Sequence, residues 1–170
     1  MSPFPRALEA PRGAITPVGE PLIARVIAAS RESPRRRMVL PLHKSPGAVL
    51  QRMLNALQPG SYVRPHKHAT PRAESLVLLR GVLRFVAFDE AGEIRRAVDL
   101  RPDADLGVDL EGDVYHTTIS LAPDSVVFEV KTGPFDPATD KIFAPWAPEE
   151  ASPGAEAFLR ELIARTNPRG

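Results

Sequence analysis

The chain has no cysteine among its 170 residues. This absence excludes a disulfide, a thiolate metal ligand and a cysteine nucleophile, and it fits the cytoplasmic location that we expect. No apolar run approaches the roughly 20 residues of a membrane span, and the N-terminal stretch MSPFPRALEAPRG lacks the apolar core of a signal peptide. A formal net charge of +1 gives no reason to expect binding to nucleic acid or to a membrane.

Proline, in contrast, is abundant. The chain has 19 prolines, which is well above the usual share of about 5%. Because proline interrupts helices and suits turns and strand ends, this content argues against a helical bundle. The length suits one ordinary domain with a full core. The sequence therefore predicts a mostly β protein made of short strands joined by loops.

The pattern along the chain predicts one domain preceded by an arm. Residues 1–19 hold four prolines without a clear period, which indicates an extended arm, either partly disordered or lying on the domain or on a partner subunit. The domain covers 20–170. It begins with a short helix at 21–31, where apolar residues recur at helical spacing. β-Prone runs and turn signals fill about 48–131, and a proline-rich wrap and a C-terminal helix follow in 132–165.

The most informative stretch is VRPHKHATPRAES, which contains His66, His68 and Glu74. Residues i and i+2 of a strand point to the same face, so the two imidazoles would converge on one point. A strand that turns at the following loop and comes back could aim the Glu74 carboxylate at that point. Imidazole and carboxylate together suit a divalent transition metal ion such as Zn, Fe, Ni or Mn. We predict one such ion per chain and leave its identity open.

Four further side chains are candidates for binding a small anionic ligand beside the metal. Arg64 and Tyr62 lie two and four residues before His66, so one continuous strand would point all three into the same interior. Arg72 lies in the loop before Glu74, and the prolines beside both arginines could instead turn them to solvent. Glu129 lies in the β-prone run SVVFEVK, where it either forms a structural ion pair or lines the cavity.

Two other features of the sequence allow more than one interpretation. The run Arg35, Arg36 and Arg37 is either a solvated charge run or an anion-binding lip over a pocket. His43 lies in a loop and is either structural, exposed or drawn into the site by a tertiary contact. The sequence does not decide between these roles.

The pattern Gly60-x5-His66-x-His68-x5-Glu74-x6-Gly81 resembles the first signature of the cupin superfamily, with one extra residue before the glutamate. The segment Gly112–His116 resembles the second signature, with a longer gap between glycine and histidine than usual. The resemblance implies an antiparallel jelly-roll barrel at about 48–131, flanked by the two predicted helices. It also implies one metal ion held by His66, His68, Glu74 and His116.

Three segments resemble WbuC-type cupin-fold metalloproteins more narrowly, and together with the residues between them they cover roughly residues 33–150. They are VRPHKHATPRAES, YHTTISLAPDSVVFEVKTGPFDP and DKIFAPWAPEE. This resemblance implies a bacterial cytoplasmic protein of a family found among polysaccharide genes and elsewhere. The resemblance favours a carbohydrate-related molecule as the ligand.

The reaction stays open at this point, because a fold does not fix chemistry. An enzyme of the isomerase or epimerase, hydrolase or dioxygenase class is one hypothesis. A non-catalytic module that senses or binds a small molecule is the second, and a metal that only staples the barrel is the third. We expect a small-molecule ligand and a homodimer, since open jelly-roll sheets leave edge strands that need cover.

Overall fold

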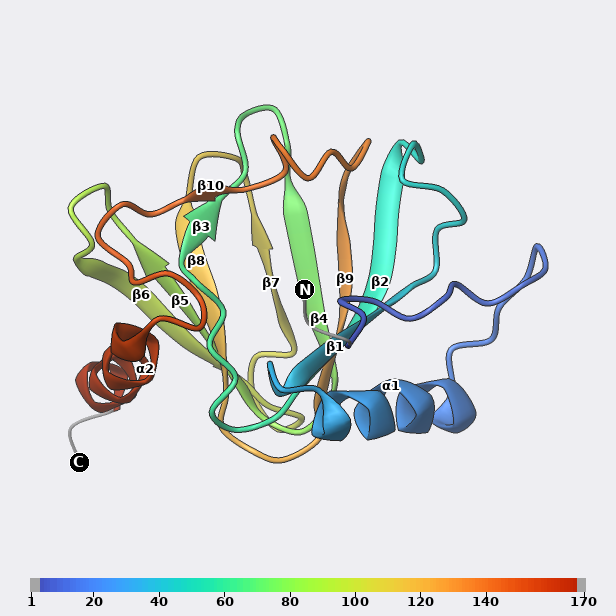
Figure 1. The fold of residues 1–170 in the computed structure, drawn as a ribbon, viewed down its shortest axis with the longest axis horizontal. Coiled ribbons are helices and arrows are strands. Elements are labelled where there is room, and N and C mark those ends of the chain that lie inside the picture. Colours follow the sequence, from blue (N-terminus) through green and yellow to red (C-terminus); the bar gives the residue numbers. More distant parts are fainter. Residues whose placement is uncertain (1–3, 168–170) are drawn as a thin grey trace.

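The computed structural model describes residues 4–167 as two antiparallel sheets packed face to face, with one helix on each (Figure 1). The first sheet has the order β1 (Arg37–Pro41), β2 (Leu50–Leu57), β9 (Ser125–Thr132), β4 (Glu74–Arg80), β7 (Gly107–Leu110). The second has the order β10 (Ile142–Phe143), β3 (His66–Lys67), β8 (Tyr115–Ser120), β5 (Leu83–Phe88), β6 (Ile94–Leu100). Most neighbours in the sheets are far apart in sequence, and this confirms the predicted jelly-roll barrel.

Side-chain alternation explains why the sheets face one another. In β4, Glu74, Leu76 and Leu78 are buried, whereas Val77 and Leu79 are exposed, as expected for a strand with one face on the core. The apolar residues of this inner face pack against residues of the second sheet. The cluster between the sheets consists of Leu57, Leu76, Leu78, Leu83, Phe85, Leu100 and Val127.

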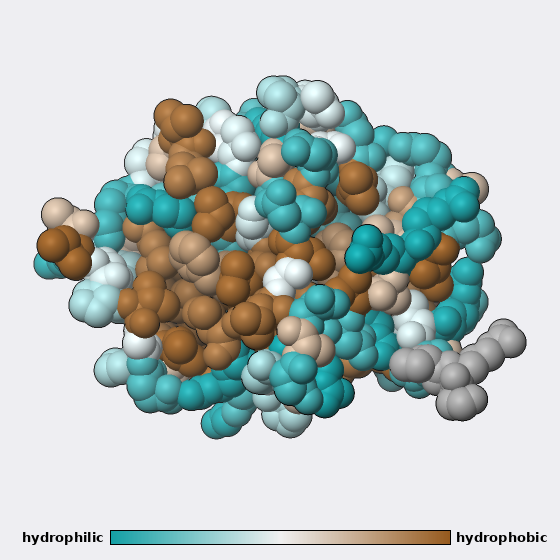
Figure 2. Space-filling view, turned by 180° about the vertical axis from the view of Figure 1, so that it is seen from behind, coloured by the Kyte–Doolittle hydropathy of each residue, from teal (hydrophilic) through white to brown (hydrophobic). Residues whose placement is uncertain are grey.

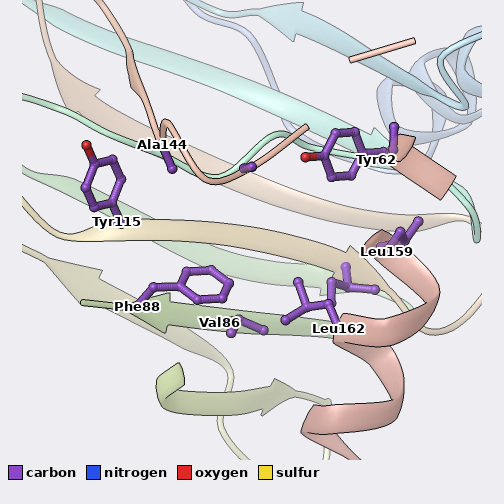
Figure 3. Close-up of a cluster of buried hydrophobic side chains, with 10 residues drawn as sticks. Tyr62, Val86, Phe88, Tyr115, Ala144, Leu159 and Leu162 are labelled. Atoms are coloured by element: carbon purple, nitrogen blue, oxygen red, sulfur yellow. The ribbon is translucent and has the colours of Figure 1, made fainter. Parts of the chain in front are cut away.

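The two helices cover outer surfaces of the barrel. The helix α1 (Glu20–Glu32) lies where the sequence predicts a helix over 21–31, and it packs Val26 and Ile27 against β1 and β2. The helix α2 (Pro153–Thr166) packs Leu159 and Leu162 against the second sheet (Figure 3). Among residues 4–167, no helix is long and apolar enough to cross a membrane.

Two irregular segments complete the barrel. The arm runs along the edge strand β1, where the Leu8 main-chain N–H donates to the Val39 carbonyl at 2.8 Å; its first three residues lie outside the described ones, as do the last three of the predicted domain. The wrap after β9 crosses the open end of the barrel, pairs briefly as β10 with β3, and leads into α2 (Figure 1). Both segments therefore border the interior of the barrel.

Candidate metal centre

Strand pairing brings the three predicted histidines together. His66 on β3 lies directly opposite His116 on β8, and His68 follows two residues after His66. The possible ligand nitrogens of the three rings all lie within 4.8 Å of one another. Each histidine residue is at most 5% exposed. The fold thus gathers three imidazoles from two strands into one buried cluster.

Glu74 joins this cluster from the opposite sheet, because it starts β4 with its side chain turned inward. Its Oε2 atom lies 3.3 Å from His68 Nε2 and 3.2 Å from His116 Nε2. The residue is 6% exposed. Glu74 therefore lies beside His68 and His116 between the two sheets, whereas the group whose ligand atoms all lie within 4.8 Å of one another consists of the three histidines.

The other nitrogen of each ring is bonded to the main chain. His66 Nδ1 donates to the Arg64 carbonyl and His116 Nδ1 to the Val114 carbonyl, both at 2.9 Å. His68 Nδ1 donates to the Asp140 carbonyl. A carbonyl only accepts, so the proton of each neutral ring is on Nδ1 and the lone pair on Nε2. Such partners fix the tautomer and orientation of histidine ligands in metal sites.

Within residues 4–167, two polar atoms of the cluster are buried without a hydrogen-bond partner, namely His68 Nε2 and Glu74 Oε2. Buried polar atoms without partners are uncommon and call for an explanation. The two atoms lie close together, yet neither the lone pair on Nε2 nor a carboxylate oxygen donates a proton to the other. A cation between them would satisfy both. The donor set, of neutral imidazoles and one carboxylate, thus fits a divalent transition ion.

The charge states of two groups suit this role. Burial, with the nearby charge of Lys141, holds the pKa of His66 well below its usual range, so the ring is neutral at neutral pH. Burial raises the pKa of Glu74, but hydrogen bonds and charge from the His116 and His68 rings in their protonated forms outweigh it and hold the pKa well below its usual range; a bound cation would take the place of these protons. The site therefore offers neutral imidazole and an ionised carboxylate.

Glu129 lies next to this carboxylate in the opposite state. Burial, followed by the charge of Glu74, raises the pKa of Glu129 to about 8, although Lys131 Nζ lies 4.0 Å away and opposes the shift. Its carboxyl accepts a hydrogen bond from Asn55 Nδ2. The structure combines the two roles that the sequence allows for Glu129, because the residue lines the cavity and also lies 4.0 Å from Lys131 Nζ.

Sequence reasoning missed a buried ion pair behind His68. Lys131 Nζ lies 2.8 Å from Asp140 Oδ2, and both side chains are buried. The main-chain carbonyl of Asp140 is the one that accepts from His68 Nδ1. Asp140 lies in the wrap, whose irregular sequence carries no periodic signal. Only a tertiary contact reveals its place beside the metal centre.

A cavity of about 310 Å³ opens beside the cluster. His66, Glu74 and His116 contribute to its wall, as do the predicted ligand contacts Arg64 and Glu129. The Arg64 guanidinium carbon lies 5.0 Å above the centre of the Phe143 ring, and its Nη2 donates to the Ala144 carbonyl at 3.3 Å. Arg72 is not among the lining residues, and its Nη1 lies 3.8 Å from Asp140 Oδ1.

The prediction that Tyr62, Arg64, His66 and His68 share one strand face is wrong. Only His66 and Lys67 pair as a strand there. The Tyr62 carbonyl accepts from Arg37 Nη1 at 2.7 Å instead of from a neighbouring strand. The Tyr62 ring lies in the cluster under α2, and its hydroxyl donates to the Pro148 carbonyl at 2.8 Å (Figure 3). Tyr62 is thus absent from the cavity wall.

The structure gives different positions to the arginines of the charge run and to His43, whose roles the sequence left open. Arg35 and Arg37 line the cavity, whereas Arg36 donates to the Pro59 carbonyl at 3.1 Å on the outside. His43 Nδ1 accepts from the Arg52 main-chain N–H at 3.0 Å, which indicates a structural role in its loop. The side chains that border the ligand cavity thus include two arginines of the charge run.

Comparison with protein families matches residues 18–100 to a family described as a domain of unknown function, DUF6016. No curated protein sequence matches the chain. The matched residues contain α1, the first part of the barrel and three of the four clustered residues. The described family supplies no activity, so what the site does has to be argued from its geometry.

Solved structures resemble the chain in fold. The ligand-free L-ribose isomerase of Cellulomonas parahominis aligns with a TM-score of 0.51 and 18% identity over 65% of this chain and 70% of that one. CapF of Staphylococcus aureus, a capsular polysaccharide assembling protein, aligns with a TM-score of 0.52 and 22% identity over 62% of this chain and 28% of that one. The Schizosaccharomyces pombe Cnp3 cupin domain has a TM-score of 0.45 and 10% identity, over 57% of this chain and 64% of that domain. At these identities the likeness concerns the fold.

Proposed function

We propose that this chain, which has the cupin fold, holds one divalent transition ion through His66, His68, Glu74 and His116 and binds a small anionic or carbohydrate-related molecule in the adjoining cavity. One observation carries the proposal. All three imidazoles are held by Nδ1, the Nε2 atoms of His68 and His116 lie next to Glu74, and among residues 4–167 His68 Nε2 and Glu74 Oε2 are buried without hydrogen-bond partners. A bound cation would satisfy these atoms.

The cavity determines what kind of molecule the site can take. A volume of about 310 Å³ lies at the lower end of the range for small-ligand pockets. A bound ion would act as a Lewis acid toward an oxygen atom of the ligand. Glu129, protonated near neutral pH, can donate a hydrogen bond to a second oxygen. Arg64 and Lys141 supply positive charge to the same wall. These groups suit a small, oxygen-rich molecule.

The proposal includes an enzyme of the isomerase or epimerase, hydrolase or dioxygenase class. The alternative is a non-catalytic cupin that senses or binds a small molecule and uses the ion as a structural staple. Three of the four proposed ligands, His66, Glu74 and His116, line the cavity, which suits an ion that faces a bound molecule in either case. Turnover of simple sugar phosphates or nucleotide sugars by the purified protein would decide for the enzyme.

The finer family assignment also belongs to the proposal. The three segments that resemble WbuC-type cupins support a bacterial, cytoplasmic protein related to polysaccharide metabolism. In the structure, two of these segments supply the four proposed ligands, and the third supplies Asp140. Because all three segments contribute to one site, they support the same family assignment.

We further propose that two copies of the chain pair. Figure 2 shows a broad hydrophobic area on the face that is turned away from the viewer in Figure 1. Val77 and Leu79 of β4 contribute exposed side chains to the outer surface of the first sheet, at 44% and 40% exposure. Apolar areas of this kind often mark interaction surfaces. Light scattering at micromolar concentration should give twice the chain mass, and a particle of 18.5 kDa would contradict pairing.

Elemental analysis tests the metal proposal. Protein purified without added metal should contain about one divalent transition ion per chain, and the His68→Ala and His116→Ala variants should lose most of it. His43→Ala is the matched control, because this histidine lies in a loop outside the cluster. Equal metal content in the wild type and in both cluster variants would overturn the proposal.

A further inference from the structure

The cavity has a second polar region, which the proposed metal does not use. Arg35 and Arg37 line it at the edge strand β1, together with Arg6 from the arm and Glu150 from the loop before α2. We call these four residues the arginine mouth. Three cations therefore face one acidic side chain. Such an imbalance at the rim of a cavity attracts anions.

Arg37 is a fixed charge in this mouth. Its side chain is only 13% exposed, and Nη1 donates to the Tyr62 carbonyl at 2.7 Å and to Ser61 Oγ at 3.3 Å. Burial, followed by the charge of Arg35, lowers the pKa of Arg37 to about 10, so the guanidinium stays charged at neutral pH. A buried charge of this kind is costly without an anionic partner.

Glu150 supplies the one anion of the mouth. Its Oε1 lies 2.6 Å from Arg35 Nε and 2.7 Å from Arg37 Nη2, so a single carboxylate oxygen is shared by two guanidinium groups. Arg6 has no ion-pair or hydrogen-bond partner among the described residues, and its charge further lowers the pKa of Arg37. One carboxylate therefore leaves the mouth with excess positive charge.

Ordinary ion pairs of this chain look different. On α2, Arg160 and Glu156 pair one to one at 2.7 Å with both side chains largely exposed to solvent. At the mouth, Glu150 lies on an irregular loop with its side chain 35% exposed, so it can move without disturbing a helix or strand. Its carboxylate marks the position where two arginines would hold another oxyanion.

We propose that the arginine mouth binds the carboxylate or phosphate group of the small ligand, and that Glu150 takes this position until the ligand displaces it. The inference rests on the proposed function, since the rest of the ligand would face the metal centre in the same cavity. It narrows the ligand class to small oxyanions. Neutral sugars would leave Arg35 and Arg37 paired with Glu150.

Calorimetric titration of the full-length purified protein tests the proposal, with inorganic phosphate and succinate as separate probes. Glu150→Gln removes the competing carboxylate and should tighten binding of at least one probe about tenfold. Arg35→Gln and Arg37→Gln should each weaken it about tenfold. Glu156→Gln and Arg160→Gln, from the exposed pair on α2, should leave binding unchanged. A response to phosphate alone indicates a phosphate ester, and a response to succinate alone indicates a carboxylic acid.

The outcome separates this inference from the metal proposal. In His68→Ala, which should lack the ion, adding Glu150→Gln should still tighten oxyanion binding if the mouth acts as described. If the protein contains its ion but the wild type, Glu150→Gln and Arg35→Gln bind the oxyanion probes with the same affinity, anion binding at the arginine mouth is contradicted. The metal proposal is unaffected by that result. If Arg37→Gln fails to fold, the affinity of Arg35→Gln for the probes tests the inference alone. The Arg35 side chain is more exposed than that of Arg37, so its replacement should disturb the fold less. Binding of neither probe also overturns the inference.

Discussion

The two ends of the cavity hold their polar groups in opposite ways. At the metal centre, three main-chain carbonyls fix the imidazoles, and every ligand is buried. At the arginine mouth, the side chains come from the arm, an edge strand and a loop, and one carboxylate is shared by two cations. The first end holds its side chains in fixed orientations. The second can exchange its carboxylate for an anion from solution.

The buried pair of Lys131 and Asp140 should matter most for the fixed end. Lys131→Met removes the nearer of two cations from the buried Asp140 carboxylate and leaves Arg72 Nη1 at 3.8 Å, which should lower the free energy of unfolding by up to about 3 kcal/mol. Because the Asp140 carbonyl orients His68, metal affinity should also fall about 10–100-fold. Urea unfolding and metal titration measure the two effects. A variant with unchanged metal affinity would show that the ion pair of Lys131 and Asp140 is not needed to hold the carbonyl that orients His68.

Removing the ion tests whether the two ends are independent. At a free metal concentration of about 100 Kd, the ion should stabilise the fold by about 3 kcal/mol, so a chelator should lower the unfolding midpoint of the wild type. The His68→Ala variant should show no such change. Glu150→Gln, altered only at the mouth, should respond to the chelator as the wild type does. A smaller shift of the unfolding midpoint in Glu150→Gln would show that the metal centre and the arginine mouth are coupled.

The pH dependence of the metal-free protein should report Glu129. The pKa of Glu129 is raised to about 8 in the folded chain, chiefly by burial, against about 4.3 when unfolded. The folded state therefore binds more protons between these values, and this contribution to stability is lost as pH rises through 8. Relative to Glu129→Gln, the wild type should lose up to about 1.4 kcal/mol per pH unit in this window.

Urea unfolding at pH 5.5, 7 and 8.5 would measure this loss. Glu129→Gln keeps the shape of the side chain but not the titration, so the difference between the two proteins isolates one carboxyl group. A difference that stays constant across the three pH values would contradict the raised pKa.

Tyr62→Phe should have the smallest effect. It removes the hydrogen bond from the Tyr62 hydroxyl to the Pro148 carbonyl, which should cost about 1 kcal/mol of stability. Because the ring lies outside the cavity, metal content and phosphate affinity should stay unchanged. A lower metal content or a weaker phosphate affinity would indicate that Tyr62 belongs to the ligand site, as the strand pattern predicts.

The buried histidine cluster could be predicted from sequence because much of its signal is local. His66 and His68 are two residues apart, Glu74 starts a strand with regular alternation, and the resemblance to cupins supplied His116. The strand pattern failed just before His66, because the main chain there bonds to the Arg37 and Thr117 side chains instead of to a neighbouring strand.

The arginine mouth could not be predicted in the same way. Its residues Arg6, Arg35, Arg37 and Glu150 come from three segments that are far apart in sequence, and none of these segments has a period that points to the cavity. The charge run allowed an anion-binding lip as one of two interpretations. Only the packing of the arm and the final loop beside β1 distinguishes Arg35 and Arg37 from Arg36.

We propose above that one ion is held by the Nε2 atoms of three histidines and by Glu74. Crystal diffraction at the absorption edge of the metal found by elemental analysis tests it most directly. We expect one anomalous peak per chain, about 2.0–2.2 Å from each of the three Nε2 atoms and from a Glu74 oxygen. A well-ordered crystal without a peak at this position, or with a peak on Nδ1 atoms, would contradict the account.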